Sequence, residues 1–213
     1  MRNISIVVSL VILVALSAFV RHAYQKKMLL FNGKNFNGWE GDTTETWRIE
    51  NGSIAGGSLD KTVPHNNFIV TKREYGNFIL RLKFKLIGKE GFVNAGVQFN
   101  SQRLTNPAYE MAGYQADLGD KYWASLYDET RRNKTLVQAD SLLIAKLLKR
   151  EDWNDYEIRS RNGRIQLFLN NKQTVDYTET DKTIPQSGHI GLQIHGGGKA
   201  IVYYKDIVLE EVK

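Results

Sequence analysis

The alternation of apolar and polar side chains predicts β-strands through most of this chain. Residues 78–86 read FILRLKFKL, with an apolar side chain at every second position, and this period of two is that of a half-buried strand. Asn-Gly pairs at 51–52 and 162–163 lie between short apolar runs, which predicts tight hairpins over 47–55 and 156–169. The same pattern predicts further strands at 95–99, 114–117, 173–177, 188–195 and 201–209.

One segment follows a helical pattern instead. Residues 141–149 read SLLIAKLLK, and Asp140 is a suitable N-cap, so we expect a short surface helix there. Strands at short spacing, with turns between them and no alternating helices, favour an all-β sandwich or jelly roll over a βαβ fold. The chain has no internal repeat and no Pro/Gly/Ser linker, so a single domain over 28–213 is the simplest organisation.

The first residues have the pattern of a targeting segment. Arg2 precedes an apolar run of 17 positions from Ile4 to Val20, interrupted only by serines, and small residues at 15 and 17 satisfy the cleavage rule. The run is short for a bilayer span, which needs about 20 residues. We therefore expect residues 1–23 to be a signal peptide or, if uncleaved, an N-terminal anchor. Either predicts an exported protein that is periplasmic, displayed at the cell surface or secreted, and that contacts a membrane only through such an anchor.

Charge and cysteine content exclude several classes of function. The formal net charge is +6, but four of the 29 basic residues and none of the 23 acidic ones lie in 1–27, which leaves +2 for the rest. A nearly neutral body gives little reason to expect a nucleic-acid partner. The chain has no cysteine, so disulfides, thiolate zinc sites and cysteine nucleophiles are excluded.

Aromatic, amide and charged side chains crowd together in 92–103 and 109–133. Aromatic faces stack on sugar C–H surfaces while amides and charged groups bond hydroxyls, so this mixture suits a neutral polyol ligand. Within strands, alternate residues share a face, which groups Asn94, Gly96 and Gln98, with Asn100 continuing the row, and groups Gln115 with Asp117. Such a face is either the floor of a wet cleft or an ordinary solvent-facing sheet surface, and the pattern alone does not separate the two.

Three side chains stand out as candidates for proton transfer. Glu110 and Asp117 are the first carboxylates to consider, because acid and base catalysis at a glycosidic bond needs two; the alternative is an ion pair with Arg131 or Arg132. His195 ends a predicted strand and precedes three glycines, where backbone can approach a ligand closely, although a lone histidine is often structural. Nucleophile-elbow, zinc-protease, P-loop and EF-hand motifs are absent, so no motif names a reaction.

Short motifs along the body resemble those of a known family in their order. They are LFNGKNFNGW at 30–39, WRIENGSI at 47–54, NAGV at 94–97, YE at 109–110, GYQAD at 113–117 and GLQIH at 191–195. In this order they resemble the 3-keto-disaccharide hydrolase domain family over about residues 28–213. The resemblance implies a concanavalin A-like jelly-roll β-sandwich and action on glycosides that carry a ketone at C3.

The chemistry implied by the resemblance is elimination followed by hydration. The C3 ketone acidifies the C2–H, a base removes that proton, the C1 oxygen leaves, and water adds to the enone. Our hypothesis assigns proton transfer to Glu110, Asp117 and His195, and stabilisation of the enolate to Arg131 or Arg132. A divalent cation could replace the arginine, with the same three proton-transfer residues as possible ligands. The side chains expected to bind the substrate are Asn94, Gln98, Gln115, Tyr127, Arg132 and Trp123.

Two other functions remain open from the sequence. A non-catalytic carbohydrate-binding module on the same sandwich would share the aromatic and amide side chains. It would show Trp123 and its neighbouring tyrosines as a flat exposed platform, whereas the enzyme needs a cleft that brings Glu110, Asp117 and His195 together. A surface adhesion or assembly module would instead expose an apolar patch and lack a polar cleft.

Overall fold

The computed structural model describes residues 27–213 of the chain. The expected signal peptide or anchor at 1–23 lies outside the described residues. Within the part that is described, no helix is long and apolar enough to cross a bilayer.

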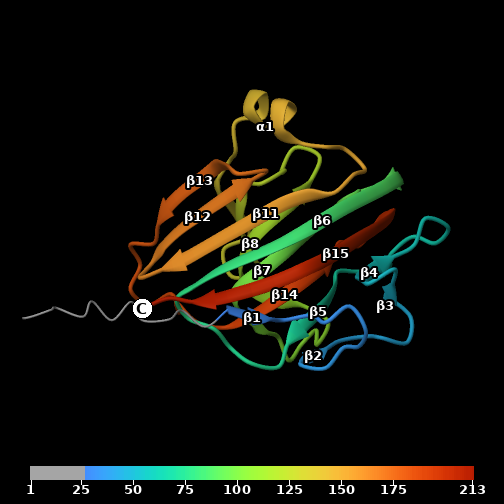
Figure 1. Ribbon diagram of the computed structural model, residues 1–213, viewed down its shortest axis with the longest axis horizontal. Helices are drawn as coiled ribbons and strands as arrows, with labels where there is room; N and C mark the ends of the chain where they lie inside the picture. The colour runs from blue at the N-terminus through green and yellow to red at the C-terminus, as the bar shows by residue number, and fades with distance from the viewer. Residues whose placement is uncertain (1–26) are drawn as a thin grey trace, which may run out of the picture.

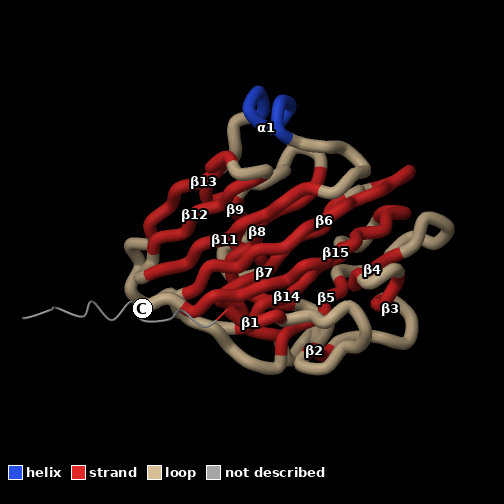
Figure 2. Tube along the Cα trace, in the orientation of Figure 1, coloured by secondary structure: helices blue, strands red, loops and turns tan. Residues whose placement is uncertain are grey.

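The described chain folds into two antiparallel β-sheets stacked face to face, with one short helix at the rim (Figures 1 and 2). The sheet at the front of Figure 1 has eight strands, in the order β13-β12-β11-β6-β15-β4-β3 with β1 beside β15. The bounds of these strands are β1 Lys27–Leu29, β3 Trp47–Glu50, β4 Ser53–Gly57, β6 Phe78–Gly91, β11 Asn154–Arg161, β12 Arg164–Leu169, β13 Lys172–Thr178 and β15 Gly198–Glu211.

The second sheet has seven strands, in the order β10-β9-β8-β7-β14-β5-β2. Its strands follow nearly the same direction as those of the first sheet, which is the aligned packing of a β-sandwich (Figure 2). The bounds are β2 Trp39–Glu40, β5 Asn67–Thr71, β7 Asn94–Arg103, β8 Met111–Gly119, β9 Leu126–Glu129, β10 Lys134–Val137 and β14 His189–Ile194. The prediction of an all-β jelly-roll sandwich is confirmed.

Local sequence signals account for the turns and the helix. Asn51 and Gly52 both adopt positive φ angles (48° and 73°), as a tight hairpin turn requires, and the 162–163 turn is built the same way. Helix α1 spans Ser141–Leu147, and the Asp140 side chain caps it by accepting from the backbone N–H groups of Leu142 and Leu143. The helix is two residues shorter than predicted because Leu148 already has an extended backbone.

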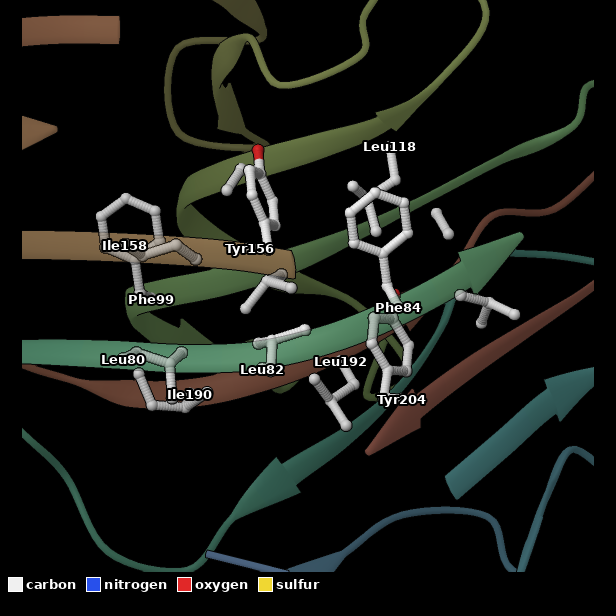
Figure 3. Packing of buried hydrophobic residues seen from close by; sticks show 14 of the residues in the cluster. Leu80, Leu82, Phe84, Phe99, Leu118, Tyr156, Ile158, Ile190, Leu192 and Tyr204 are labelled. Atoms are coloured by element: carbon white, nitrogen blue, oxygen red, sulfur yellow. The ribbon is translucent and has the colours of Figure 1, made fainter. Parts of the chain in front are cut away.

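The core lies between the sheets and draws alternate residues from each strand. Leu80, Leu82 and Phe84 of β6 face Leu192 of β14 and neighbouring apolar side chains across the interlayer space (Figure 3). Tyr204 of β15 crosses this space, and its hydroxyl lies 2.9 Å from the carbonyl oxygens of both Gly96 and Gln193. One phenol therefore links the front sheet to two central strands of the second sheet, β7 and β14.

Candidate functional site

A pocket of about 380 Å³ lies on the outer face of the seven-stranded sheet. Strands β7, β8 and β9 supply its floor, and the start of β10 and the turns at the strand ends supply its rim. The side chains that line it are Phe92, Asn94, Gln115, Asp117, Tyr122, Tyr127, Glu129, Asn133, Lys134, Thr135 and His195.

The period of two in β8 and β9 explains why polar side chains gather there. Tyr114, Ala116 and Leu118 point into the core, so Gln115 and Asp117 point to the opposite face. In β9, Leu126 is in the core and the pocket receives Tyr127 and Glu129. Of the amides grouped from the sequence, Asn94 and Gln115 therefore lie in the floor of a cleft rather than on an open sheet surface.

A directional chain of hydrogen bonds ends at Asp117. The Ser101 hydroxyl donates to Gln98 Oε1 (2.7 Å), Gln98 Nε2 donates to Gln115 Oε1 (3.1 Å), and Gln115 Nε2 donates to Asp117 Oδ1 (2.8 Å). All four side chains are buried. Because each amide is fixed at both ends, the Asp117 carboxyl is held in one orientation.

Two carboxyl groups of the pocket have strongly raised pKa values. Burial raises the pKa of Asp117 to about 8, and the charge of Glu129 adds to this, while hydrogen bonds from Gln115 and Asn94 oppose it. Burial also raises the pKa of Glu129 to about 7, with a further contribution from the charge of Glu110. Asp117 is therefore mostly a neutral acid at pH 7, and Glu129 is near its midpoint.

His195 brings a ring nitrogen with a free lone pair. Its backbone N–H donates to the Asn94 carbonyl oxygen (3.0 Å), which fixes it beside β7. Its Nδ1 lies 2.7 Å from the Gly196 carbonyl oxygen. A carbonyl oxygen can only accept, so Nδ1 carries the proton, and in the neutral ring Nε2 is left as a base.

Two loops meet beside the pocket and are joined by Asn66. Its Nδ2 donates to Glu110 Oε2 (3.1 Å), and its Oδ1 accepts from the Gly196 N–H (3.2 Å). The neighbouring His65 and Tyr109 rings stack at 3.9 Å between centroids. Glu110 is thus a link between loops that does not line the pocket, although its charge acts on Glu129.

The structure brings together some of the residues expected at the site. Asp117 and His195 of the proton-transfer candidates line the pocket, and Glu110 does not. Gln98 lies beneath the floor, where it orients Gln115. The expected substrate-binding side chains that line the pocket are Asn94, Gln115 and Tyr127.

Arg131 and Arg132 lie on the wrong side of the sheet for the role expected of them. Both guanidinium groups pair with Asp128, whose side chain is fully buried, and Arg132 also pairs with Glu179 at 2.8 Å. Glu179 in turn accepts from the hydroxyl of Tyr114, which points into the core. The expectation that these arginines stabilise an enolate in the pocket is therefore wrong. Asp128 alternates with Tyr127 and Glu129 in β9 and points away from the pocket, and the two arginines pair with it there.

Trp123 is also displaced from its expected place. It packs in the core, where its ring centroid lies 6.2 Å from that of Phe84, and its Nε1 donates to Asp120 Oδ1 (3.0 Å). It is buried, so it forms no exposed platform with its neighbouring tyrosines. Its edge borders a second hollow beside the pocket.

Sequence reasoning missed two charged residues of the pocket, Glu129 and Lys134. Glu129 could have been found from its spacing, since it follows Tyr127 by two positions in a strand. Lys134 begins β10 on the far side of a turn, and no short-range pattern places it at the rim. Lys134 places a positive charge at the pocket, where Arg131 and Arg132 were expected to supply one.

The structure does not bring together the three residues considered from the sequence as ligands of a divalent cation. Among residues 27–213, no three His, Asp or Glu side chains come together as a metal-ligand group. Glu110, which is tied to Asn66, is not placed with Asp117 and His195 for that purpose.

Most of the chain matches a known protein family. The family model of the 3-keto-alpha-glucoside-1,2-lyase-like domain matches residues 26–210. This chain belongs to that family. The resemblance noted from the short motifs is thereby confirmed, whereas curated proteins give no significant match.

Solved structures show the same fold at low sequence identity. A candidate glycosyl hydrolase from Parabacteroides distasonis is similar at 21% identity and a TM-score of 0.65, with 88% of this chain and 94% of that chain covered. The carbohydrate-binding module CBM66 from Bacillus subtilis is similar at 14% identity and a TM-score of 0.62 (83% and 98% covered). The β-glucanase of Bacillus licheniformis is similar at 8% identity and a TM-score of 0.55 (89% and 98% covered).

Proposed function

We propose that this protein is a carbohydrate-active enzyme that cleaves 3-keto-glycosides by elimination across C1 and C2, followed by hydration to the free 3-keto sugar. One observation carries the proposal. A neutral carboxylic acid (Asp117), a carboxyl near its midpoint (Glu129) and an imidazole whose Nδ1 faces a carbonyl oxygen, leaving Nε2 for the ligand (His195), lie together in the pocket. Proton abstraction beside a ketone and protonation of a leaving oxygen need such a set.

The elimination step uses His195 as base and Asp117 as acid. His195 Nε2 removes the proton from C2, and the electron pair of that bond delocalises into the C3 ketone as an enolate. The enolate then expels the C1 oxygen, which receives the proton of Asp117. The products are a sugar enone, the free alcohol, an imidazolium and an aspartate.

Three groups favour the negative charge that develops on the C3 oxygen. Lys134 contributes a positive charge at the rim, and the Asn94 amide is a hydrogen-bond donor. Burial and the charges of Glu129 and Asp117 raise the pKa of Tyr127, so its hydroxyl keeps its proton and can donate.

Hydration returns the protons. The Asp117 carboxylate takes a proton from water as the hydroxide adds to C1, and the His195 imidazolium returns a proton to C2. Both residues then regain their starting states, so no net proton is consumed. Glu129, whose pKa is about 7, raises the pKa of Asp117 when it is ionised.

The deciding experiment is release of a chromogenic alcohol from an aryl 3-keto-glucoside by the purified protein. We expect release by the wild type, with Asp117→Asn and His195→Gln each at least about a hundredfold slower, as for loss of an acid or base. Turnover is expected to survive a chelator, because the pocket gathers no metal-ligand group. Full turnover by both variants would overturn the assignment.

A second candidate, a non-catalytic carbohydrate-binding domain, has support from the fold shared with CBM66. It predicts saturable binding of plain glycans and no alcohol release. The matched test is the same aryl glucoside without the ketone, which this enzyme should not cleave because its C2–H is not acidic.

We also propose that the protein is exported, on the strength of the apolar run at 4–20. Fractionation of the expressing cells, together with N-terminal sequencing of the mature chain, tests both export and cleavage. A full-length chain that remains in the cytoplasm would contradict it.

A further inference from the structure

Two lysines on the outer face of the eight-stranded sheet have no carboxylate partner within the part of the chain that the structure describes. Lys85 of β6 and Lys205 of β15 point outward, because the residues that precede them in each strand are in the core. Their neighbour Lys83 points the same way but pairs with Asp155 (3.1 Å). Two positive charges on this face are therefore not neutralised by the described residues.

Two aromatic rings hold these lysines in place. Lys205 Nζ lies 3.9 Å from the centroid of the Trp153 ring. Lys85 Nζ lies 5.2 Å from the same centroid and 4.8 Å from that of the Tyr203 ring. Each ammonium group is attracted by a ring face, so both charges are concentrated around one indole. Tryptophan, tyrosine and lysine side chains are the residues that proteins place at the interface between membrane and water.

An exposed leucine lies on the same face of this sheet. Strand β1 pairs with β15, and Met28 in the middle of β1 packs against the core, so Lys27 and Leu29 point outward. Leu29 is 63% exposed, which is unusual for a large apolar side chain of the described residues. An apolar side chain on a face that also carries aromatic rings and free cations suits a lipid surface, because lipids offer both acyl chains and charged headgroups.

The position of this face also fits a membrane contact. The apolar run at 4–20, on which the export proposal rests, closely precedes β1, and β1 is a strand of this same sheet. The candidate pocket lies on the outer face of the other sheet. In a sandwich the two outer faces point in opposite directions, and the face with the two lysines is turned toward the viewer in Figure 1. A bilayer against that face would leave the pocket open to the solvent.

We propose that the outer face of the eight-stranded sheet rests on an anionic bilayer surface and thereby turns the pocket away from the membrane. Headgroup phosphates neutralise Lys85 and Lys205, the rings of Trp153 and Tyr203 lie at headgroup level, and Leu29 enters the boundary of the acyl chains. An acidic polysaccharide would also neutralise the lysines, but it gives Leu29 no apolar partner. The contact is additional to the N-terminal anchor considered from the sequence, and it does not depend on the proposed reaction.

Trp153 is a built-in probe of this contact, because the other three tryptophans of the chain are buried. The full-length protein is reconstituted into phosphatidylcholine vesicles that contain either phosphatidylglycerol or phosphatidylcholine brominated near the headgroup. We expect the brominated anionic lipid to quench tryptophan emission more than the brominated neutral lipid, and Trp153→Phe to lose this quenching.

The contribution of the two lysines is tested by K85Q/K205Q. Each lysine near an anionic surface favours the contact about fivefold, so this variant should lose the excess quenching by the anionic lipid. The matched control is K61Q/K146Q, which removes two exposed charges from a loop and from α1 and should keep the excess.

Single cysteines report which face meets the lipid, since the chain has none of its own. Leu29→Cys places an environment-sensitive fluorophore on the proposed contact face. Ala108→Cys places it on the side that holds the pocket, near Phe68 on the outer side of β5. On anionic vesicles we expect the emission of the label at 29 to shift to the blue and that of the label at 108 to stay unchanged.

Several outcomes would overturn the proposal. They are equal quenching by the two brominated lipids, loss of the excess in K61Q/K146Q as well, and a blue shift at 108 instead of 29. If neither lipid quenches Trp153 but polygalacturonate changes its emission in the wild type and not in K85Q/K205Q, the face binds an acidic polysaccharide and the bilayer contact is refuted. No response to lipid or polysaccharide refutes it too.

Discussion

Gln115 donates its side-chain amide to Asp117 across 2.8 Å, and its own amide oxygen is occupied by Gln98. The pairing has a chemical consequence. Asp117 Oδ1 is an acceptor in this bond, so the proton of the neutral carboxyl belongs on the other oxygen. A buried acid is thereby presented to the pocket in one orientation.

The pH dependence of turnover should report the titration of Asp117. With its pKa raised to about 8, the acid is lost above that pH. We expect kcat/KM to fall about tenfold per pH unit on the alkaline side. The measurement is a pH profile on an aryl 3-keto-glucoside, and a profile that stays level through pH 10 would contradict the role.

The same group should lower the stability of the protein as pH rises. The folded pKa is about 8 against 3.8 for the free side chain, so between these values the folded state holds a proton that the unfolded state has lost. Stability from this group therefore falls from about pH 4 to pH 8, by at most about 1.4 kcal/mol per unit. Asp117→Asn removes the effect, so its Tm should exceed that of the wild type by a margin that grows with pH in thermal scans. A margin independent of pH would count against it.

Gly96 is required because the Gln115 side chain lies across it. A Cβ at this position would lie 2.6 Å from Gln115 Cδ, so alanine must displace the residue that orients Asp117. We expect Gly96→Ala to fold and to lose about tenfold or more in kcat, since misplacement by about 1 Å can cost a hundredfold. Gly76→Ala is the control, because its Cβ would meet nothing closer than 3.9 Å. Equal activities would show that Gln115 does not position the acid.

Glu110 should act on the site through its charge. Its carboxylate contributes to raising the pKa of Glu129, so Glu110→Gln should bring that pKa below about 7. Carboxyl carbon chemical shifts followed by NMR against pH measure this directly. Glu45→Gln, which removes an exposed charge from another loop, should leave the titration of Glu129 unchanged. An unchanged midpoint in Glu110→Gln would refute the electrostatic link.

Arg132 should matter for stability more than for chemistry. It pairs with Asp128 and Glu179, whose side chains are 0% and 3% exposed, so its removal leaves the buried Glu179 without its cation and leaves Asp128 with Arg131 alone. We expect Arg132→Met to destabilise the fold by about 3 kcal/mol, measured by urea unfolding. Arg164→Met, at an exposed pair, should cost under about 1 kcal/mol. Loss of turnover in a variant of normal stability would restore a direct catalytic role.

The sequence predicted the faces of the strands better than the turns between them. Period two correctly grouped Gln115 with Asp117, because a residue in a strand has only two directions in which to point. After Glu129 the backbone turns, with positive φ at Thr130 and Asn133, and no periodicity survives such a turn. The buried Asp128 then attracts both arginines to the core side of the sheet, which no local pattern reveals. Lys134 lies beyond the same turn, so the alternation of β9 does not predict that it lines the pocket.

The row at 94–100 shows a similar limit. Asn94 and Gln98 lie on the pocket side as predicted, but Asn100 has a positive φ of 46° and donates instead to Ser160 of the opposite sheet (2.9 Å). The pairing of β7 with β8 shifts register between Phe99 and Gln102. A bulge of this kind redirects every later side chain, so the alternation holds only up to it.

Strand β8 places catalytic candidates and core residues at alternating positions along one short stretch, with Tyr114, Ala116 and Leu118 inward and Gln115 and Asp117 outward. Gain or loss of a single codon within it would exchange the two faces, burying the amide and the acid between the layers and exposing three apolar side chains. Insertions and deletions are therefore expected to be tolerated only in the loops on either side of this stretch. The geometry of the candidate site thus depends on the number of residues in β8 as much as on their identity.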